Sequence, residues 1–289
     1  MAERKKITVR DIVKMKGQRP IVMITAYDTP TARIVDESGV DMILVGDSLG
    51  MVVLGMESTL QVTMEDMLRH TAAVARASPK ALVVGDMPFL SYEVGGREAV
   101  ENAGLFLRAG ADAVKIEGGS EYVDVVRSLV RAGIPVMGHI GLTPQKHKLL
   151  GGYRLMGKTA SEALSIIRDA EELSEAGVFS IVIEFTSWEV AKKVTERVKV
   201  PTICIGSGPY CDGQVVVLHD IIGLTSNPPP FTRVFRDVAS VLREAVREYA
   251  AAVRERKFPE KGMYWGMKEG EYEKLEKLLS APRRDGDLG

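Results

Sequence analysis

The sequence is poor in cysteine and in net charge, and it has no long apolar run. Only two cysteines, Cys204 and Cys211, occur among 289 residues, far fewer than a disulfide scaffold needs, so we expect a reducing, cytoplasmic location. Basic and acidic residues number 38 and 39, which leaves no positive field to attract nucleic acid or an anionic membrane. No stretch approaches the roughly 18 apolar residues of a membrane helix, and no signal-peptide core follows the N-terminus. We therefore expect neither a nucleic-acid nor a membrane partner.

The composition is that of a globular protein with a sizeable core. Hydrophobic residues make up 45% and charged residues 27%, which excludes disorder for most of the chain. The length fits either two average domains or one α/β barrel of about 250 residues. Because no break in composition separates two parts, we predict a single domain over residues 1–289, with an N-terminal cap at 1–20 and a charged tail at 258–289.

Eight short apolar runs, rich in Val and Ile, are typical of strands buried on both faces of a parallel sheet. They span residues 21–25, 42–45, 81–84, 113–117, 135–137, 180–184, 201–205 and 215–218. Four of the intervening helical segments end in a glycine just before the next strand, at Gly39, Gly110, Gly133 and Gly177, where a left-handed C-cap is expected. The repetition predicts an α/β fold, a (β/α)8 TIM barrel with an N-terminal capping helix and a C-terminal helical extension from about residue 232.

Ionisable residues lie at the ends of five successive predicted strands. They are Asp47, Asp86, Lys115, Glu117, His139 and Glu184. In a closed βα barrel the carboxyl ends of all strands converge on one mouth, where catalytic residues lie. A single Asp after a strand is as often a helix N-cap, but the joint pattern indicates a reactive rim.

Three of these residues predict a metal site. Lys115 and Glu117 are two apart on one strand and therefore share a face, which must be the barrel interior if helices cover the outside. If the strand were instead an exposed edge strand, this face would be in contact with solvent. Asp47, Asp86 and Glu117 together need a cation to remain ionised. Oxygen ligands favour Mg²⁺ or Mn²⁺ over zinc, so we predict one Mg²⁺ per subunit.

His139 and Glu184 suggest other roles. For His139, a satisfied structural histidine or a hydrogen-bond donor to substrate is favoured over a metal ligand. Glu184 stands between Ile183 and Phe185, and an unpaired carboxylate in apolar surroundings has a raised pKa that suits general acid–base catalysis.

Two glycine-bearing loops are candidate ligand contacts. Residues 206–208 follow the seventh strand, where many such barrels bind phosphate; a tight turn is the alternative. Residues 142–158 have the paired glycines of an active-site lid, and a plain surface loop is the alternative. The fingerprints of a dinucleotide fold and of a P-loop are absent.

Six segments together resemble the ketopantoate hydroxymethyltransferase (3-methyl-2-oxobutanoate hydroxymethyltransferase) family. They are residues 25–28 (TAYD), 45–51 (VGDSLGM), 85–89 (GDMPF), 114–119 (VKIEGG), 138–145 (GHIGLTPQ) and 212–214 (DGQ). Ser207 departs from the family pattern, because a small residue such as alanine is expected there, and the charged tail beyond residue 260 is additional.

The resemblance implies a (β/α)8 barrel that assembles into a homo-oligomer, a decamer of paired pentamers, in the pantothenate and coenzyme A pathway. It implies transfer of a hydroxymethyl group from 5,10-methylenetetrahydrofolate to 3-methyl-2-oxobutanoate, giving 2-dehydropantoate (ketopantoate) and tetrahydrofolate. A 2-oxo acid can chelate Mg²⁺, which then stabilises the enolate formed when the C3 proton is removed.

The resemblance also implies a role for each matching residue. Those expected to hold Mg²⁺ are Asp47, Asp86 and Glu117; those expected to contact substrate are Asp47, Ser48, Asp86 and Lys115, with His139 helping to orient it; the proton acceptor is Glu184. We further expect Asp86→Ala to abolish activity with little change in melting temperature, because a rim residue contributes little to the core.

Two other functions remain open at this point. One is a Mg²⁺-dependent, enolate-forming lyase or mutase of the phosphoenolpyruvate mutase and isocitrate lyase type, which would be expected to carry a catalytic cysteine on a loop after the middle strands; residues 142–158 contain none. The other is a non-catalytic barrel that binds a metabolite.

Overall fold

The strands form one closed parallel barrel. In the computed structural model, which describes residues 4–281, the eight strands pair in sequence order and β8 pairs with β1. Their bounds are β1 (Ile21–Thr25), β2 (Met42–Val45), β3 (Leu82–Asp86), β4 (Ala113–Glu117), β5 (Val136–Gly141), β6 (Ser180–Glu184), β7 (Thr202–Ile205) and β8 (Gly213–Val216). The predicted (β/α)8 barrel is confirmed.

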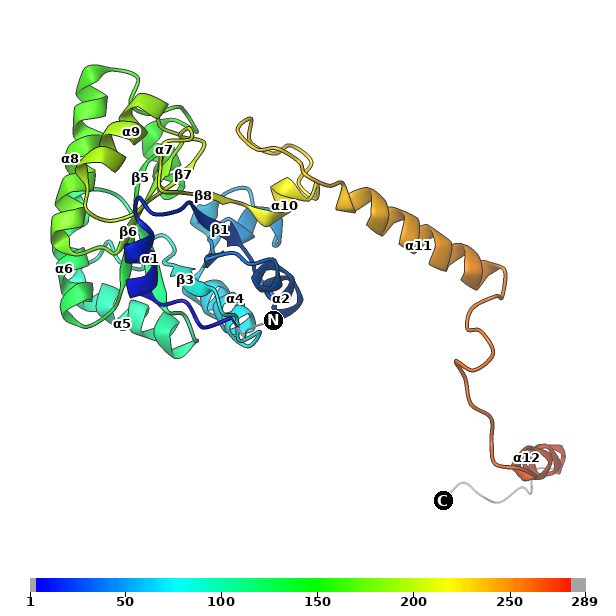
Figure 1. The fold of residues 1–289 in the computed structure, drawn as a ribbon. Helices are drawn as coiled ribbons and strands as arrows, with labels where there is room; N and C mark the ends of the chain where they lie inside the picture. Colours follow the sequence, from blue (N-terminus) through cyan, green and yellow to red (C-terminus); the bar gives the residue numbers. More distant parts are fainter. Residues whose placement is uncertain (1–3, 282–289) are drawn as a thin grey trace. The chain divides into compact units, whose positions relative to one another are not determined.

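Six longer helices surround the strands (Figure 1). They are α2 (Thr29–Glu37), α4 (Met64–Ala75), α5 (Gly96–Arg108), α6 (Val123–Arg131), α8 (Ala160–Ala176) and α9 (Trp188–Arg197). Short helices lie in the connections: α3 (Leu49–Val52), α7 (His147–Leu150), α10 (Leu218–Ile221), and the 3₁₀ turns η1 (Thr59–Gln61), η2 (Ser120–Tyr122) and η3 (Pro144–Lys146). The β7–β8 connection contains no helix.

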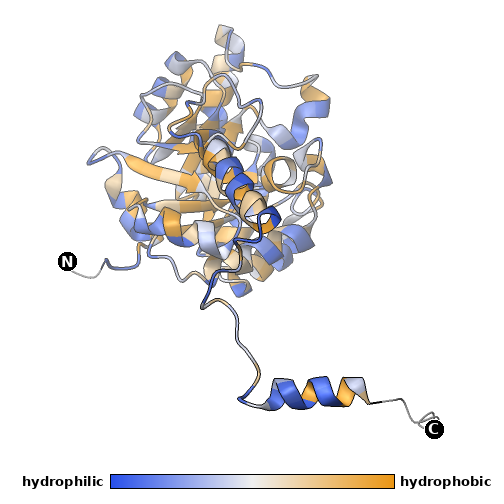
Figure 2. Cartoon of the chain, turned by 90° about the vertical axis from the view of Figure 1, so that its right-hand side faces the viewer, coloured by the Kyte–Doolittle hydropathy of each residue, from blue (hydrophilic) through white to orange (hydrophobic). Residues whose placement is uncertain are grey.

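Two apolar layers pack on the inside and the outside of the strands. On β4, Ala113 lies in the inner layer, whereas Val114 and Ile116 lie in the outer layer beneath the helices. Because side chains alternate along a strand, Lys115 and Glu117 point inward, as predicted. Figure 2 shows the strands as mostly hydrophobic ribbon and hydrophilic residues along the surrounding helices.

Helix α1 (Val9–Met15) packs against the inner layer from the N-terminal side of the barrel. Thr8 and Asp11 form a capping box, in which each side chain accepts a hydrogen bond from the other residue's backbone N–H. Ile12 is fully buried and joins Ile21 and Met23 in the inner layer. Helix α1 is thus the predicted N-terminal capping helix, and the bounds 1–20 of the cap stay a prediction.

The chain separates into two compact units, Met1–Arg236 and Asp237–Gly289. The second contains α11 (Val238–Arg254), within the predicted helical extension, and α12 (Glu271–Ser280). The last eight residues of the predicted tail lie outside the described part of the chain, and the single-domain prediction stays a prediction. Among residues 4–281, no helix is both long and apolar enough to span a membrane.

The two cysteines are joined to each other. The β7–β8 connection reverses so that Cys204 and Cys211 lie 5.7 Å apart at Cα and form a disulfide, a separation typical of such bonds. Sequence spacing alone did not indicate this, because it does not show that the connecting loop folds back on itself.

Candidate active site

Three carboxylates meet at the C-terminal end of the barrel. Asp47 lies two residues past β2, Asp86 ends β3 and Glu117 ends β4. One oxygen atom from each lies within 4.8 Å of the others, and the three residues are 5%, 1% and 1% exposed. The backbone N–H of Asp47 donates to Asp86 Oδ2 over 3.2 Å. The sequence prediction that these three residues lie together is therefore met by the geometry.

Lys115 is the cation at the centre of this cluster. Its Nζ lies 2.7 Å from Asp86 Oδ1 and 3.5 Å from Glu117 Oε1, and the residue is 3% exposed. Burial lowers the pKa of Lys115, but the charges of the neighbouring carboxylates outweigh burial and raise that pKa. The lysine therefore stays protonated.

The three carboxyl groups differ in their pKa. Burial raises the pKa of Asp47 well above its usual value, and the charges of Asp86 and Glu117 raise it further. Burial also raises the pKa of Asp86, against the opposing effect of Lys115. For Glu117, burial is outweighed by Lys115 and His139, which lower the pKa to about 2. Fully ionised, the three carboxylates would hold more negative charge than Lys115 balances, and their oxygen donors fit Mg²⁺ in type.

His139 on β5 connects the carboxylate cluster to Glu184 on β6. His139 Nδ1 lies 3.3 Å from Glu117 Oε1, and His139 Nε2 lies 3.2 Å from Glu184 Oε2. Burial and the charge of Lys115 lower the pKa of His139, but the interactions with Glu117 and Glu184 outweigh them and raise that pKa to about 9. The expectation that Glu184 is unpaired is therefore wrong, because the neighbouring strand places an imidazole against it.

Ser48 follows Asp47 and faces a tyrosine. Ser48 occupies the N-cap position of α3 but makes no capping hydrogen bond with its side chain. Instead its Oγ lies 2.9 Å from the hydroxyl of Tyr27, which is 1% exposed. Tyr27 fixes the direction of the Ser48 hydroxyl, and sequence reasoning did not single this tyrosine out.

Gln145 is a site residue that sequence reasoning missed. Its Nε2 donates to Asp47 Oδ2 over 2.9 Å and to the Met87 carbonyl over 3.0 Å. Its backbone N–H donates to Glu117 Oε2 over 3.0 Å, and its Oε1 accepts from the Tyr92 hydroxyl over 2.8 Å. Gln145 is the last residue of segment 138–145, one of the six segments that resemble the family, so the resemblance could have pointed to it. Nothing in its spacing places it beside two carboxylates from other strands.

The predicted lid, residues 142–158, is anchored at both ends. Gln145 near its start is 3% exposed, and near its end Met156 pairs with Thr186, just past β6. Between these anchors His147 stacks on Tyr153, with ring centroids 5.6 Å apart. Burial and the charges of Asp47, Glu184 and Glu117 raise the pKa of Tyr153. The negative charge of the site therefore acts on Tyr153, in the middle of the loop.

Residues 206–208 form a turn packed against neighbouring side chains. Ser207 is 1% exposed and its hydroxyl faces the end of β6. A Cβ added to Gly206 would meet the ring of Phe231 at 2.7 Å. Of the two sequence interpretations, the structure favours the turn over a phosphate site.

Solved structures with the same fold include enzymes of small acids. A phosphonopyruvate hydrolase in complex with oxalate and Mg²⁺ superposes with a TM-score of 0.58 at 13% identity, covering 94% of this chain and 97% of that chain. A phosphoenolpyruvate phosphomutase from Streptomyces platensis subsp. rosaceus gives 0.59 at 13% identity, with the same coverage of each chain. At this level of identity the likeness shows the fold alone.

Sequence comparison is far more specific. Residues 6–261 match the family model described as ketopantoate hydroxymethyltransferase. A 3-methyl-2-oxobutanoate hydroxymethyltransferase from Hyperthermus butylicus is 65% identical over 289 residues, covering 99% of this chain and 100% of the relative. One from Staphylothermus marinus is 63% identical over 270 residues, covering 93% and 100%. This chain therefore belongs to the ketopantoate hydroxymethyltransferase family.

Proposed function

We propose that the protein transfers a hydroxymethyl group from 5,10-methylenetetrahydrofolate to 3-methyl-2-oxobutanoate, in the pathway to pantothenate and coenzyme A. Water supplies the hydroxyl oxygen, and the products are 2-dehydropantoate and tetrahydrofolate. The observation that carries the proposal is the buried group of Asp47, Asp86 and Glu117, whose oxygens lie within 4.8 Å, connected to Glu184 through His139. Family membership supplies the substrates.

Glu184 is the proposed proton acceptor. Its side chain is 18% exposed, whereas that of Glu117 is 1% exposed, so Glu184 can reach a substrate in the barrel mouth. Its carboxylate takes the proton from C3 of the oxo acid. The electron pair left on C3 forms a bond to the folate methylene carbon, and both bonds from that carbon to folate nitrogens break. The oxygen of water forms the second new bond to the carbon, and the two nitrogens take up the C3 proton and one proton of the water.

His139 and Lys115 prepare the site for the negative charge of the substrate. His139 lies against Glu184 and orients its carboxylate, while Lys115 offsets the negative charge of Asp86 and of the incoming acid. Ser48, directed by Tyr27, is placed to hydrogen-bond the substrate. Asp47, Asp86 and Glu117 would hold one Mg²⁺, which supplies Lewis-acid stabilisation of negative charge on the oxo acid.

Hydrogen exchange tests the proposal. The protein is incubated with 3-methyl-2-oxobutanoate and Mg²⁺ in deuterated buffer, and deuterium at C3 is followed by NMR. We expect metal-dependent exchange that Glu184→Gln abolishes, while calorimetry still finds one Mg²⁺ per chain and oxo-acid binding. Glu189→Gln, on the exposed face of α9, is the matched control and should exchange normally. Exchange that survives in Glu184→Gln would refute the assignment of the base.

A lyase of the isocitrate lyase type is less well supported. Such an enzyme is expected to use a free cysteine near the middle strands, and this chain has no free cysteine, because Cys204 and Cys211 are bonded to each other. Incubation with the oxo acid and the folate donor separates the two: only the transferase forms 2-dehydropantoate.

We also propose that copies of the chain assemble into a homo-oligomer. The family resemblance implies that this oligomer is a decamer. Helix α11 has no buried residue. Leu242, Val246, Tyr249 and Val253 form an apolar stripe at helical spacing, 43–65% exposed. An exposed apolar stripe of this kind is typical of a protein interface. Light scattering of the wild type should give a mass of about ten times 31.6 kDa, and Val246→Glu should lower that mass. A monomer mass for both the wild type and the variant would refute assembly.

We further propose that the protein carries out this reaction in the cytoplasm. The Cys204–Cys211 bond is compatible with this, because some intracellular proteins keep buried disulfides. Fractionation of cells and immunodetection of the protein would check the location; recovery outside the cytoplasmic fraction would contradict it.

A further inference from the structure

The backbone changes direction immediately after Glu184. The next residue, Phe185, has φ of +40°, a left-handed conformation that is uncommon for any residue other than glycine. Such a backbone conformation is unfavourable and persists only where its surroundings hold it. Because the direction of the Glu184 side chain depends on this backbone, whatever holds Phe185 also aims the carboxylate.

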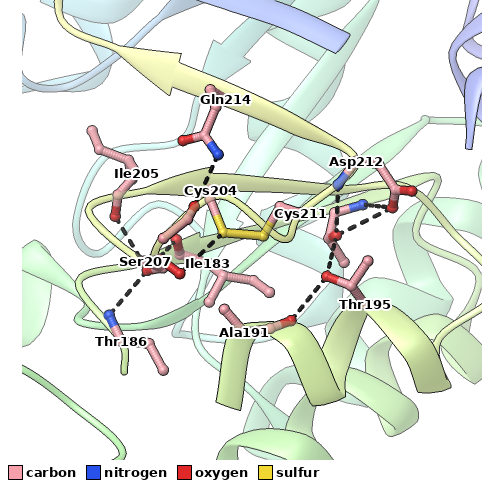
Figure 3. Close-up of a disulfide and its surroundings, with 12 residues drawn as sticks. Ile183, Thr186, Ala191, Thr195, Cys204, Ile205, Ser207, Cys211, Asp212 and Gln214 are labelled. Atoms are coloured by element: carbon pink, nitrogen blue, oxygen red, sulfur yellow. Dashed lines mark hydrogen bonds between the residues drawn. A yellow bond between two sulfur atoms is a disulfide. The ribbon is translucent and has the colours of Figure 1, made fainter. Parts of the chain in front are cut away.

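Ser207 is a side chain that spans this turn, beside the backbone hydrogen bonds that Phe185 makes with Ile205 and Met156. Its Oγ donates to the carbonyl of Ile183 over 2.9 Å and accepts from the backbone N–H of Thr186 over 3.0 Å. These two groups stand on either side of Glu184 and Phe185, so one hydroxyl spans the turn (Figure 3). Ser207 is 1% exposed, and water therefore does not readily replace the hydroxyl.

A disulfide closes the loop that carries Ser207. Cys204 lies on β7 and Cys211 lies two residues before β8, so their bond joins the two ends of the loop. Gln214 Nε2 adds a hydrogen bond to the carbonyl of Gly208 over 3.0 Å. A closed short loop has few other conformations available. The position of Ser207 is therefore fixed relative to β7 and β8.

We propose that Ser207, fixed by the Cys204–Cys211 bond, is a positioning residue that keeps Glu184 against His139 Nε2 in the orientation needed for proton transfer. The inference rests on the proposed role of Glu184 as the base. Without the hydroxyl, the buried N–H of Thr186 loses its acceptor, and the turn can relax. A displacement of about 1 Å at a reacting group can cost about 100-fold in rate.

The first test compares Ser207→Ala with Ser180→Ala. Ser180 is a matched control, because it is fully buried on the same strand as Glu184, at the opposite end, and its Oγ donates to the Pro201 carbonyl over 2.9 Å. The family pattern has a small residue such as alanine at this position, and the backbone hydrogen bonds of Phe185 remain in Ser207→Ala. We therefore expect C3 exchange and kcat to fall by about 10-fold, with KM for the oxo acid and Mg²⁺ affinity unchanged. Ser180→Ala should keep the wild-type rate even if it lowers the melting temperature.

A kinetic isotope effect adds a readout that a purely structural role would not change. With substrate deuterated at C3, the isotope effect on kcat should increase in Ser207→Ala, because proton removal becomes rate-limiting. Equal exchange rates in Ser207→Ala and wild type would overturn the inference. So would a rate loss of the same size in Ser180→Ala.

The second test removes the disulfide. Thiol titration of the unfolded wild type should find no free thiol; two free thiols would overturn the part assigned to the bond. Cys204→Ala combined with Cys211→Ala should lower C3 exchange with unchanged binding, and adding Ser207→Ala should lower it by less than the product of the separate effects, because both act through one loop. If Ser207→Ala does not fold, the cysteine variant decides, and unchanged exchange there overturns the inference.

These outcomes are separable from failure of the proposed function. If Glu184→Gln still exchanges the C3 proton, the role of Glu184 is wrong. If Glu184→Gln abolishes exchange but Ser207→Ala and the cysteine variant leave it intact, only the role of Ser207 is wrong.

Discussion

Replacing Lys115 with Met should destabilise the metal-free protein strongly. The side chain volume is nearly kept, but the cation 2.7 Å from Asp86 Oδ1 is lost, and three buried carboxyl groups remain within 4.8 Å of one another. Removing one partner of a buried ion pair costs about 3–5 kcal/mol. For a domain of this size each kcal/mol lowers the melting temperature by about 2–4 °C, so the expected loss is roughly 6–20 °C, measured by calorimetry in EDTA.

Mg²⁺ should reverse much of that loss. A ligand at about 100 times its dissociation constant stabilises a folded protein by about 2.7 kcal/mol. Without the lysine, the carboxylates repel each other more, so Mg²⁺ should raise the melting temperature of the variant more than that of wild type. Lys193→Met is the control, because that lysine is 62% exposed and pairs with Glu196 on the surface, where an ion pair contributes little to stability. Equal losses in both variants, or no response to Mg²⁺ in either, would refute the reasoning.

Two further predictions concern residues that support the site. Gln145→Leu removes the side-chain hydrogen bond to Asp47 and should weaken Mg²⁺ binding, measured by calorimetry, about 10–100-fold. Gln18→Leu, on the exposed surface, is the control and should bind Mg²⁺ as the wild type does. Equal Mg²⁺ affinities of the two variants would contradict the role given to Gln145. In Gly141→Ala the added Cβ would lie 2.4 Å from the carbonyl oxygen of Glu184, so C3 exchange should fall about 10-fold or more. Gly133→Ala shares a positive φ but has open space around it, and a similar loss of exchange there would rule out the explanation by crowding.

The barrel was predictable because its strands follow simple rules. Apolar runs bounded by polar residues located all eight strands, and the period of two placed Lys115 and Glu117 on the inner face. The end of β5 was predicted too early, because Gly138 and His139 read as a strand end. In the structure β5 continues to Gly141, since the inward-facing His139 finds partners in the site and the ladder with β6 goes on.

The parts that could not be predicted come from loops. Gln145 and the disulfide depend on how connections fold back over the barrel, and no periodicity in the sequence describes that. The same limit explains the revised expectation for Asp86→Ala. Asp86 is 1% exposed and pairs with Lys115, so its removal leaves a buried lysine without its closest partner and should lower the melting temperature as well as activity.

The balance of charge in the site favours a divalent cation as a ligand. Asp47, Asp86, Glu117 and Glu184 face two cationic groups, Lys115 and His139, so two negative charges lack a partner when all four acids are ionised. Asp47 carries the consequence, because burial and its two acidic neighbours raise its pKa most clearly. One divalent cation held by Asp47, Asp86 and Glu117 would neutralise those two charges. A singly charged oxo acid would then enter a site without net charge instead of one that repels it, so a site built from acids can bind an acid once its metal is in place.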